Sequence, residues 1–388
     1  MRALSAILPS PAETWLLQAC LLPGDRARAA WAASGGQGGH VVHLFREDTR
    51  GLKMLGPLLN RAVHGNSLPA SPTALTVLRT AQLREELRSR EYRRILGHVL
   101  STLAAAEIPA VVLQGAALSE LVYDDPSLRH SHDVELLLDE ADLPRAVSVL
   151  TAAGLGRPVD ASLARVFFEH PSGLPVVLQR DLFGEALYGP RANEAWAASE
   201  RRAIAGAPTR VLSRLDNLLH VCGRASYFPT RDSLLWVCDA WLLATRGSGL
   251  DWDQLIERAT ASRLLLPVDV VLGYLVQELD APVPGPVLAR LHAAAATVDP
   301  LTLDVALFGA RASGRSGLVG LLRAAGSWQE RLRLLHRLLF PSAAYMRHAY
   351  DVAGTAWLPL YYVYRPLSYL CTRLRSARAR IARGPRHP

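Results

Sequence analysis

Lysine is almost absent from this sequence. Lys53 is the only one, so arginine supplies nearly all of the 43 basic residues, against 35 acidic ones. The formal charge of +8 would by itself admit a nucleic-acid-binding protein. A genomic codon bias explains the preference for arginine without any nucleic acid. A nucleic-acid-binding regulator is therefore only a third hypothesis, which rests on net charge alone.

Cysteine and long apolar runs are also scarce. Cys20, Cys222, Cys238 and Cys371 are far apart, without the close pairs of a zinc site or the density of a disulfide framework. We expect buried thiols in a reducing compartment. The longest uncharged aromatic stretch, 352–364, has 13 residues, whereas about 20 are needed to span a bilayer. The N-terminus makes a poor signal peptide, so we expect a cytoplasmic protein without a transmembrane segment.

What is present is the composition of a folded protein of two or three domains: half of the 388 residues are hydrophobic and a fifth are charged. Between 108 and 183 the pattern predicts β-α-β-α-β-β, in which Pro171–Gly173 close a hairpin. A long amphipathic helix from Ser71 to about 106 precedes it. After about 190 we predict only helices, at 211–223, 230–246, 252–262, 264–279, 284–296 and 316–339. The predicted domains are an N-terminal helical segment (1–69), an α/β core (70–190), a C-terminal helical domain (191–372) and a basic tail (373–388).

Residues 129–138, RHSHDVELLL, place two acids in an otherwise apolar strand. Because side chains alternate along a strand, Asp133 and Glu135 share one face, about 7 Å apart. Buried acids are costly unless they are neutralised, and a pair of divalent ions would neutralise them. The same two residues can instead be surface acids on a solvated edge strand. Asp239, in an apolar helix, is either a buried partner of a residue such as Arg224 or exposed on the helix surface.

A second feature lies some eighteen residues upstream. VVLQG, residues 111–115, ends a strand in a glycine that opens a helix. The first turn of a helix has free backbone N–H groups, which favour phosphate oxygens. His130 and His132 flank the acids, and we expect them to line the cleft or to form hydrogen bonds with the loop, rather than to bind a transition metal.

The stretch IPAVVLQGAALSELVYDDPSLRHSHDVELLLDEADLPRAVSVLTAAGL, residues 108–155, resembles nucleotidyltransferase-like proteins of the polymerase-β superfamily, particularly an uncharacterised bacterial branch. The resemblance covers about 95–185 and, more loosely, the helical C-terminal part. It implies an α/β (α+β) fold, with a small mixed-sheet core flanked by helical regions. It also implies an enzyme that uses Mg²⁺ or Mn²⁺ to move a nucleoside monophosphate from a nucleoside triphosphate to a hydroxyl-type acceptor, with release of pyrophosphate. The acceptor would be a small molecule, a peptide or a protein.

The resemblance also assigns roles to residues. Asp133 and Glu135 would hold the metal ions, and Gln114 and Gly115 would lie against phosphate. Arg129 would offer a bidentate phosphate contact, although a pairing with a nearby aspartate is an equal alternative.

Three positions depart from the pattern of this branch. Gln114 stands where the branch has lysine, and Glu135 where it has aspartate. Val177 stands where the third carboxylate belongs, and the Leu-His that follows in the branch is replaced by Leu178 and Gln179. Asp181 is the candidate replacement, since it shares a face with Val177 if the strand persists. The alternative function is a degenerate fold that binds a peptide or protein partner without catalysis.

Overall fold

The computed structural model describes residues 7–35, 41–42, 52–158, 160–161, 165–182, 192–227, 234–247 and 249–298, with isolated positions at 328–329, 331–332, 336 and 359–362. Its described strands form one seven-stranded mixed sheet in the order β3-β4-β5-β2-β1-β7-β6. The strands are β1 Val111–Leu113, β2 Val134–Leu137, β3 Asp160–Ala161, β4 Arg165–Glu169, β5 Pro175–Gln179, β6 Glu200–Ile204 and β7 Ala207–Val211. The predicted α/β class with a mixed sheet is confirmed.

The expectation that the chain is only helical after about residue 190 is wrong, because β6 and β7 extend the sheet beyond β1. Ile204 pairs with Ala207, so Ala205 and Gly206 form a two-residue hairpin loop with φ of 51° and 79°. Both φ values are positive, as a two-residue type I′ hairpin turn requires. The usual sequence signal for such a turn is Asn-Gly, and alanine is not part of it. Four of the five β6 residues are exposed, so the strand also lacks an apolar alternation. These two features hid the hairpin in the sequence.

The predicted long helix is confirmed as α6, Pro72–Ala105, where the Ser71 hydroxyl accepts the N–H of Ala74 at 3.2 Å. Most helices expected after residue 211 are also confirmed; the segment at 316–339 lies almost wholly outside the described residues. The other helices are α2 Pro11–Leu21, α3 Gly24–Ala33, α5 Gly56–Gly65, α7 Gln114–Leu121, α8 Leu143–Leu150, α9 Ala192–Ala197, α10 Arg214–Tyr227, α11 Leu235–Thr245, α12 Trp252–Ala261, α13 Leu265–Leu279 and α14 Gly285–Ala296. Short turns η1 Leu52–Leu55, η2 Pro126–Leu128 and η3 Thr151–Leu155 join them.

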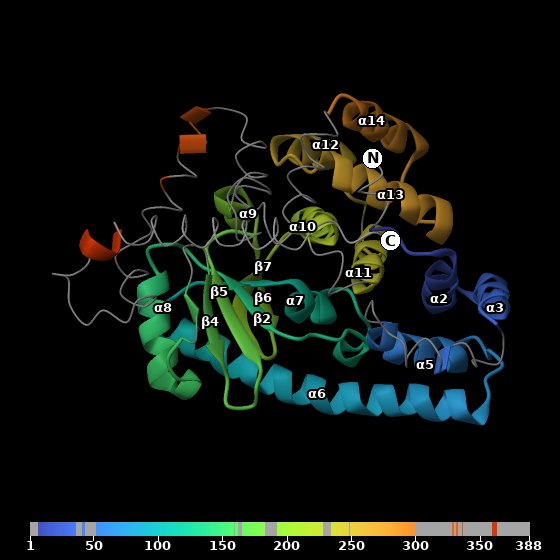
Figure 1. The fold of residues 1–388 in the computed structure, drawn as a ribbon, viewed down its shortest axis with the longest axis horizontal. Coiled ribbons are helices and arrows are strands. Elements are labelled where there is room, and N and C mark those ends of the chain that lie inside the picture. Colours follow the sequence, from blue (N-terminus) through green and yellow to red (C-terminus); the bar gives the residue numbers. More distant parts are fainter. Residues whose placement is uncertain are drawn as a thin grey trace, which may run out of the picture.

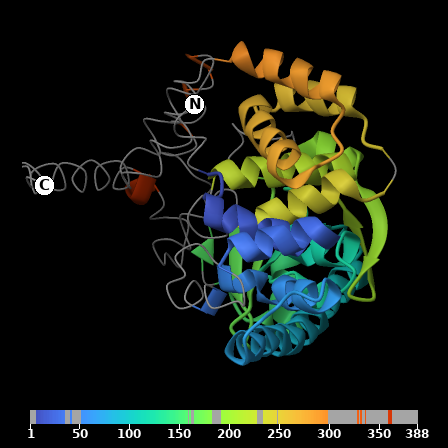
Figure 2. The same cartoon turned by 90° about the vertical axis from the view of Figure 1, so that its right-hand side faces the viewer.

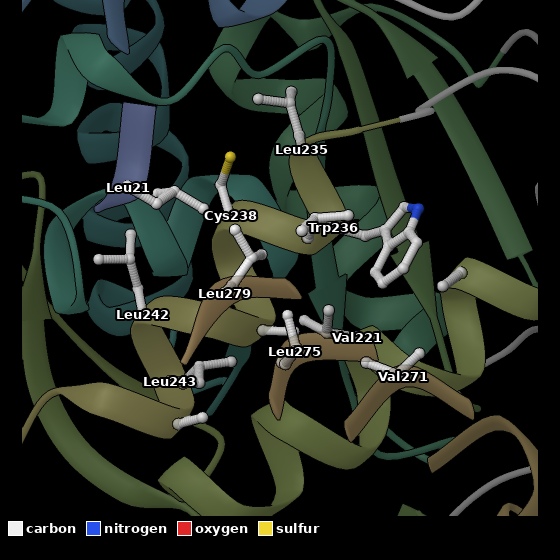
Figure 3. Packing of buried hydrophobic residues seen from close by; sticks show 14 of the residues in the cluster. Leu21, Val221, Leu235, Trp236, Cys238, Leu242, Leu243, Val271, Leu275 and Leu279 are labelled. Atoms are coloured by element: carbon white, nitrogen blue, oxygen red, sulfur yellow. The ribbon is translucent and has the colours of Figure 1, made fainter. Parts of the chain in front are cut away.

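The sheet is covered on both faces, as its strand burial requires. Val112, Leu136 and Leu178 pack with residues of α6 and α8. Val111 and Leu137, on the opposite face, join a core with residues of α10, α11 and α13. Figure 1 shows α6 along one side of the sheet and α10 and α11 along the other, and Figure 2 shows α12–α14 beyond them. The leucine-rich packing of α11 and α13 is seen in Figure 3.

Among the described residues, no helix is long and apolar enough to cross a membrane. Three of the four thiols, Cys20, Cys222 and Cys238, are buried and reduced, as expected, and burial raises the pKa of each. Cys371 lies outside the described residues.

Candidate functional site

A pocket opens where the carboxyl end of β1 enters α7, between the sheet core and the helices α10 and α11. The core side of this pocket is formed by Gln114, Gly115, Leu118, Arg129, Ser131, His132 and Asp133. The helical side is formed by His220, Val221, Arg224, Ala225, Leu235, Trp236 and Asp239. Four of the predicted site residues, Gln114, Gly115, Arg129 and Asp133, therefore do converge on one pocket.

Glu135 does not line this pocket. It lies beneath it, 3 % exposed, and its carboxylate is already hydrogen-bonded. Oε2 accepts the side-chain amide of Gln114 at 2.5 Å and that of Gln179 at 3.5 Å, while Oε1 lies 3.6 Å from the guanidinium of Arg224. The resemblance implies lysine at position 114 and histidine at 179; here both residues are glutamines, and both amides donate to the same acid. This closed arrangement argues against the predicted role of Glu135 as a metal ligand.

The start of α7 is strained and tightly packed. Gln114 has a φ of 54°, a left-handed conformation that costs a side-chain-bearing residue energy and marks functional positions. A methyl group on Gly115 would lie 2.6 Å from the Ser131 hydroxyl and 3.0 Å from the Arg129 guanidinium. The predicted space for a phosphate at Gly115 is thus filled by two of the protein's own side chains, which are themselves hydrogen-bond donors.

Arg129 forms its principal contact with Asp239 of α11, not with Asp124 or Asp125. Its Nε and Nη2 donate to the two carboxylate oxygens at 3.0 and 2.8 Å, and the side chains are 11 % and 3 % exposed. Tyr123 donates its hydroxyl to Asp239 at 2.7 Å, and burial, followed by the nearby Asp239 charge, raises the pKa of Tyr123. The fork of Arg129 is therefore committed to a carboxylate rather than open to a phosphate.

The place of the third carboxylate is apolar. Val177 is the register partner of Glu135 on the neighbouring strand and is 2 % exposed. The strand ends at Gln179, so the alternation that would have carried Asp181 to the same face does not continue. Asp181 lies 3.7 Å from the guanidinium of Arg180 and does not line the pocket. The prediction of Asp181 as a third catalytic acid is not supported by this arrangement.

A hydrogen-bonded row of side chains leads from α6 to the pocket wall. The Nδ1 of His130 lies 2.6 Å from the carboxylate of Glu85, and its Nε2 lies 3.0 Å from the Nδ1 of His132. Burial lowers the pKa of His130, and the hydrogen bond to Glu85 opposes this effect. The expectation that these histidines line the cleft is confirmed for His132. Sequence reasoning missed Glu85, although its spacing of seven from the buried Leu78 places it on the inner face of α6.

A family model described as "Uncharacterised nucleotidyltransferase" matches residues 52–280, more than half of the chain. The chain belongs to this family. The match extends beyond the sheet to α13, so it includes both walls of the pocket.

Among solved structures, this nucleotidyltransferase-family chain is similar to an antigenic nucleotidyltransferase-like protein from Paracoccidioides brasiliensis. The identity is 17 %, the match covers 53 % of this chain and 94 % of that one, and the TM-score is 0.33. None of the curated proteins matches the chain.

The resemblance implies a two-metal site held by three carboxylates. In the part of the chain that the structure describes, no three histidine, cysteine, aspartate or glutamate side chains are grouped to hold a metal ion. Asp133 lines the pocket, Glu135 is engaged below it, and Val177 replaces the third acid. A two-metal site does not fit these residues.

Proposed function

We propose that this protein transfers a nucleoside monophosphate from a nucleoside triphosphate to a hydroxyl group of a small molecule, peptide or protein. The acceptor oxygen bonds to the α-phosphorus, and the bond from that phosphorus to the bridging oxygen breaks. Pyrophosphate leaves, and the hydroxyl proton passes to solvent. The observation that carries the proposal is that a family match over 52–280 spans both walls of one pocket, on which Asp133 of the acidic strand remains.

The positive charges of the pocket favour an anionic substrate, but carboxylates of the protein partly neutralise them. Arg224, on the helical side, would stabilise negative charge on the phosphates. Asp239 neutralises Arg129, and Glu135 lies beside Arg224. Because a two-metal site does not fit, no step of the transfer is assigned to a metal. Dependence on Mg²⁺ or Mn²⁺ stays a prediction, with Asp133 as the carboxylate that would meet a metal-bound triphosphate.

A second candidate function is favoured by one observation, the closed cluster of Glu135, Gln114 and Gln179 with Val177 beside it. The two amides and the carboxylate bond to one another as in a structural core, although the buried Oε1 of Gln179 has no hydrogen-bond partner among the described residues. The fold would then serve as a binding module for a peptide or protein partner, without nucleotide chemistry.

Thermal unfolding in the presence of ATP, GTP, CTP or UTP, with and without Mg²⁺ or Mn²⁺, separates the two functions. A ligand at a hundred times its dissociation constant stabilises the folded state by about 2.7 kcal/mol. For the transferase we expect a metal-dependent rise in the melting temperature of the wild type that is lost in Asp133→Ala. Asp253→Ala, an exposed acid of α12 paired with Arg290, is the matched control and should keep the response.

If no nucleotide shifts the wild type, the transferase proposal fails and the binding module takes its place. If a nucleotide does shift it, α-labelled nucleotide incubated with candidate acceptors should give a labelled product and free pyrophosphate. Binding without any transfer to these acceptors would favour the degenerate fold.

A further inference from the structure

Trp236, in the first turn of α11, differs from the buried Trp31 and from the half-buried Trp241. The indole N–H groups of Trp31 and Trp241 each donate to a backbone carbonyl, Pro69 at 2.7 Å and Leu279 at 2.8 Å. Trp236 is 8 % exposed, yet among the described residues its N–H has no acceptor. Buried tryptophan N–H groups usually find a partner. The exception lies on the wall of the pocket.

The indole nitrogen of Trp236 is not sealed from solvent, and the residue lines the pocket. The indole thus offers the pocket apolar surface and one hydrogen-bond donor.

The pocket is divided in a way that matches the two parts of a nucleotide. Ser131, His132 and Asp133 form a polar wall beside the start of α7. On the helical side, Val221, Leu235 and Trp236 are apolar. Ligand pockets of this kind combine apolar lining with a few polar groups that fix orientation. The hydroxyl of Ser131 and the imidazole of His132 can donate to phosphate oxygens, and the three apolar residues suit an aromatic ring.

We propose that Trp236 recognises the nucleobase: its ring stacks on the base, and its N–H donates to an acceptor atom at the edge of the base. This inference rests on the proposed function, since it names the part of the nucleoside triphosphate that Trp236 contacts. Stacking of a base on an aromatic side chain changes affinity by about five- to a hundredfold. Trp236 would then determine the preference for a base.

The experiment compares nucleoside triphosphates with inorganic triphosphate, which has no base, by titration calorimetry. We expect the wild type to bind at least one nucleoside triphosphate more tightly than inorganic triphosphate. Trp236→Leu should reduce the nucleotide affinity by about tenfold or more and leave that for inorganic triphosphate unchanged. Trp236→Phe keeps an aromatic face but loses the N–H donor, so its nucleotide affinity should lie between the two.

Trp241→Phe is the matched control, because Trp241 lies on the same helix, bonds to Leu279 and does not line the pocket. It should keep the nucleotide affinity of the wild type. Equal losses for nucleotide and inorganic triphosphate in Trp236→Leu would overturn the inference and indicate a packing role. Unchanged nucleotide affinity in Trp236→Leu would overturn it while leaving the proposed function intact. Absence of nucleotide binding by the wild type would overturn both.

Discussion

Arg129 and Asp239, 110 positions apart, form a buried two-pronged ion pair that joins the loop before β2 to α11. A second contact runs in the opposite sense: Arg224 of α10 lies 3.6 Å from Glu135 of β2. The sheet core thus contributes one cation and one anion, and the helical part contributes the complementary pair. Arg129, Arg224 and Asp239 line the pocket, and the two contacts bind its walls together.

Asp239→Asn should destabilise the protein by about 3–5 kcal/mol. The substitution leaves the guanidinium of Arg129 buried without its counter-charge, and the loss of one partner of a buried pair is strongly destabilising. Urea denaturation gives the free energy of unfolding. Asp253→Asn is the control, because Asp253 and Arg290 form an exposed pair, which should contribute little. A loss below 1 kcal/mol in Asp239→Asn would show that the pair does not hold the walls together.

The sequence predicts the parts of this site that are formed by residues close together in the chain, and not the contacts between distant residues. The stretch RHSHDVE, residues 129–135, and the strand-glycine-helix turn are local patterns, and they located one wall of the pocket. The apolar helix around Asp239 allowed this residue to be either buried, with a partner such as Arg224, or exposed on the helix surface. The actual partner is Arg129, since helix periodicity gives the buried face and not the element that packs against it.

Local proximity misled in the same way at Arg129. Asp124, five positions away, pairs instead with Arg61 and Arg246. The hydrogen bonds that close off Glu135 come from β5 and the start of α7, and only the sheet register brings them together. The sequence shows which residue types stand at 114, 135 and 179. It does not show that the two glutamines donate hydrogen bonds to Glu135.

Gly115→Ala should destabilise the fold by about 1–3 kcal/mol, because the new methyl group would meet the Ser131 hydroxyl at 2.6 Å and force a local shift. Removal of that hydroxyl in the double variant Gly115→Ala with Ser131→Ala should restore part of the loss. The remaining cost comes from the Arg129 guanidinium at 3.0 Å. Unfolding in urea of the two single variants and the double variant gives the coupling energy.

Gly65→Ala is the control for this cycle, since a methyl group at the end of α5 would meet nothing within 4 Å. It should be neutral or slightly stabilising. Additive effects of Gly115→Ala and Ser131→Ala would contradict the close approach of the two residues.

His130 and His132, which form a hydrogen-bonded row with Glu85, should share one tautomer, with the proton on Nδ1. The ionised carboxylate of Glu85 accepts from His130 Nδ1, so the Nε2 of neutral His130 has a lone pair that accepts from His132 Nδ1. Long-range proton–nitrogen correlation spectra of the ¹⁵N-histidine-labelled protein identify the tautomers. His98, whose Nε2 lies 3.3 Å from the carbonyl of Ala153, should show the opposite tautomer. A proton on Nε2 of His130 would rule out this row of hydrogen bonds.

Stability should fall in mild acid because of His220. This imidazole is buried and bonds through Nε2 to the carbonyl of Leu182 at 3.0 Å. Burial, and then the positive charges of Arg224 and Arg165, lower the pKa of His220 from 6.5 to about 3. Below pH 6.5 the unfolded chain therefore takes up a proton at this site and the folded protein does not. The contribution of neutral His220 is complete above that pH and is lost as the pH falls towards 3.

Between pH 7 and 5 this effect should remove about 2 kcal/mol from the free energy of unfolding, at a slope of up to about 1.4 kcal/mol per pH unit. His220→Gln keeps a donor for the Leu182 carbonyl but does not titrate, so its stability should fall less steeply over the same range. His130, whose pKa is also lowered, accounts for part of the slope that remains. His64→Gln, at an exposed position on α5, should follow the wild type. Parallel curves for the wild type and His220→Gln in urea denaturation from pH 7 to 5 would mean that His220 does not stay neutral in the folded protein.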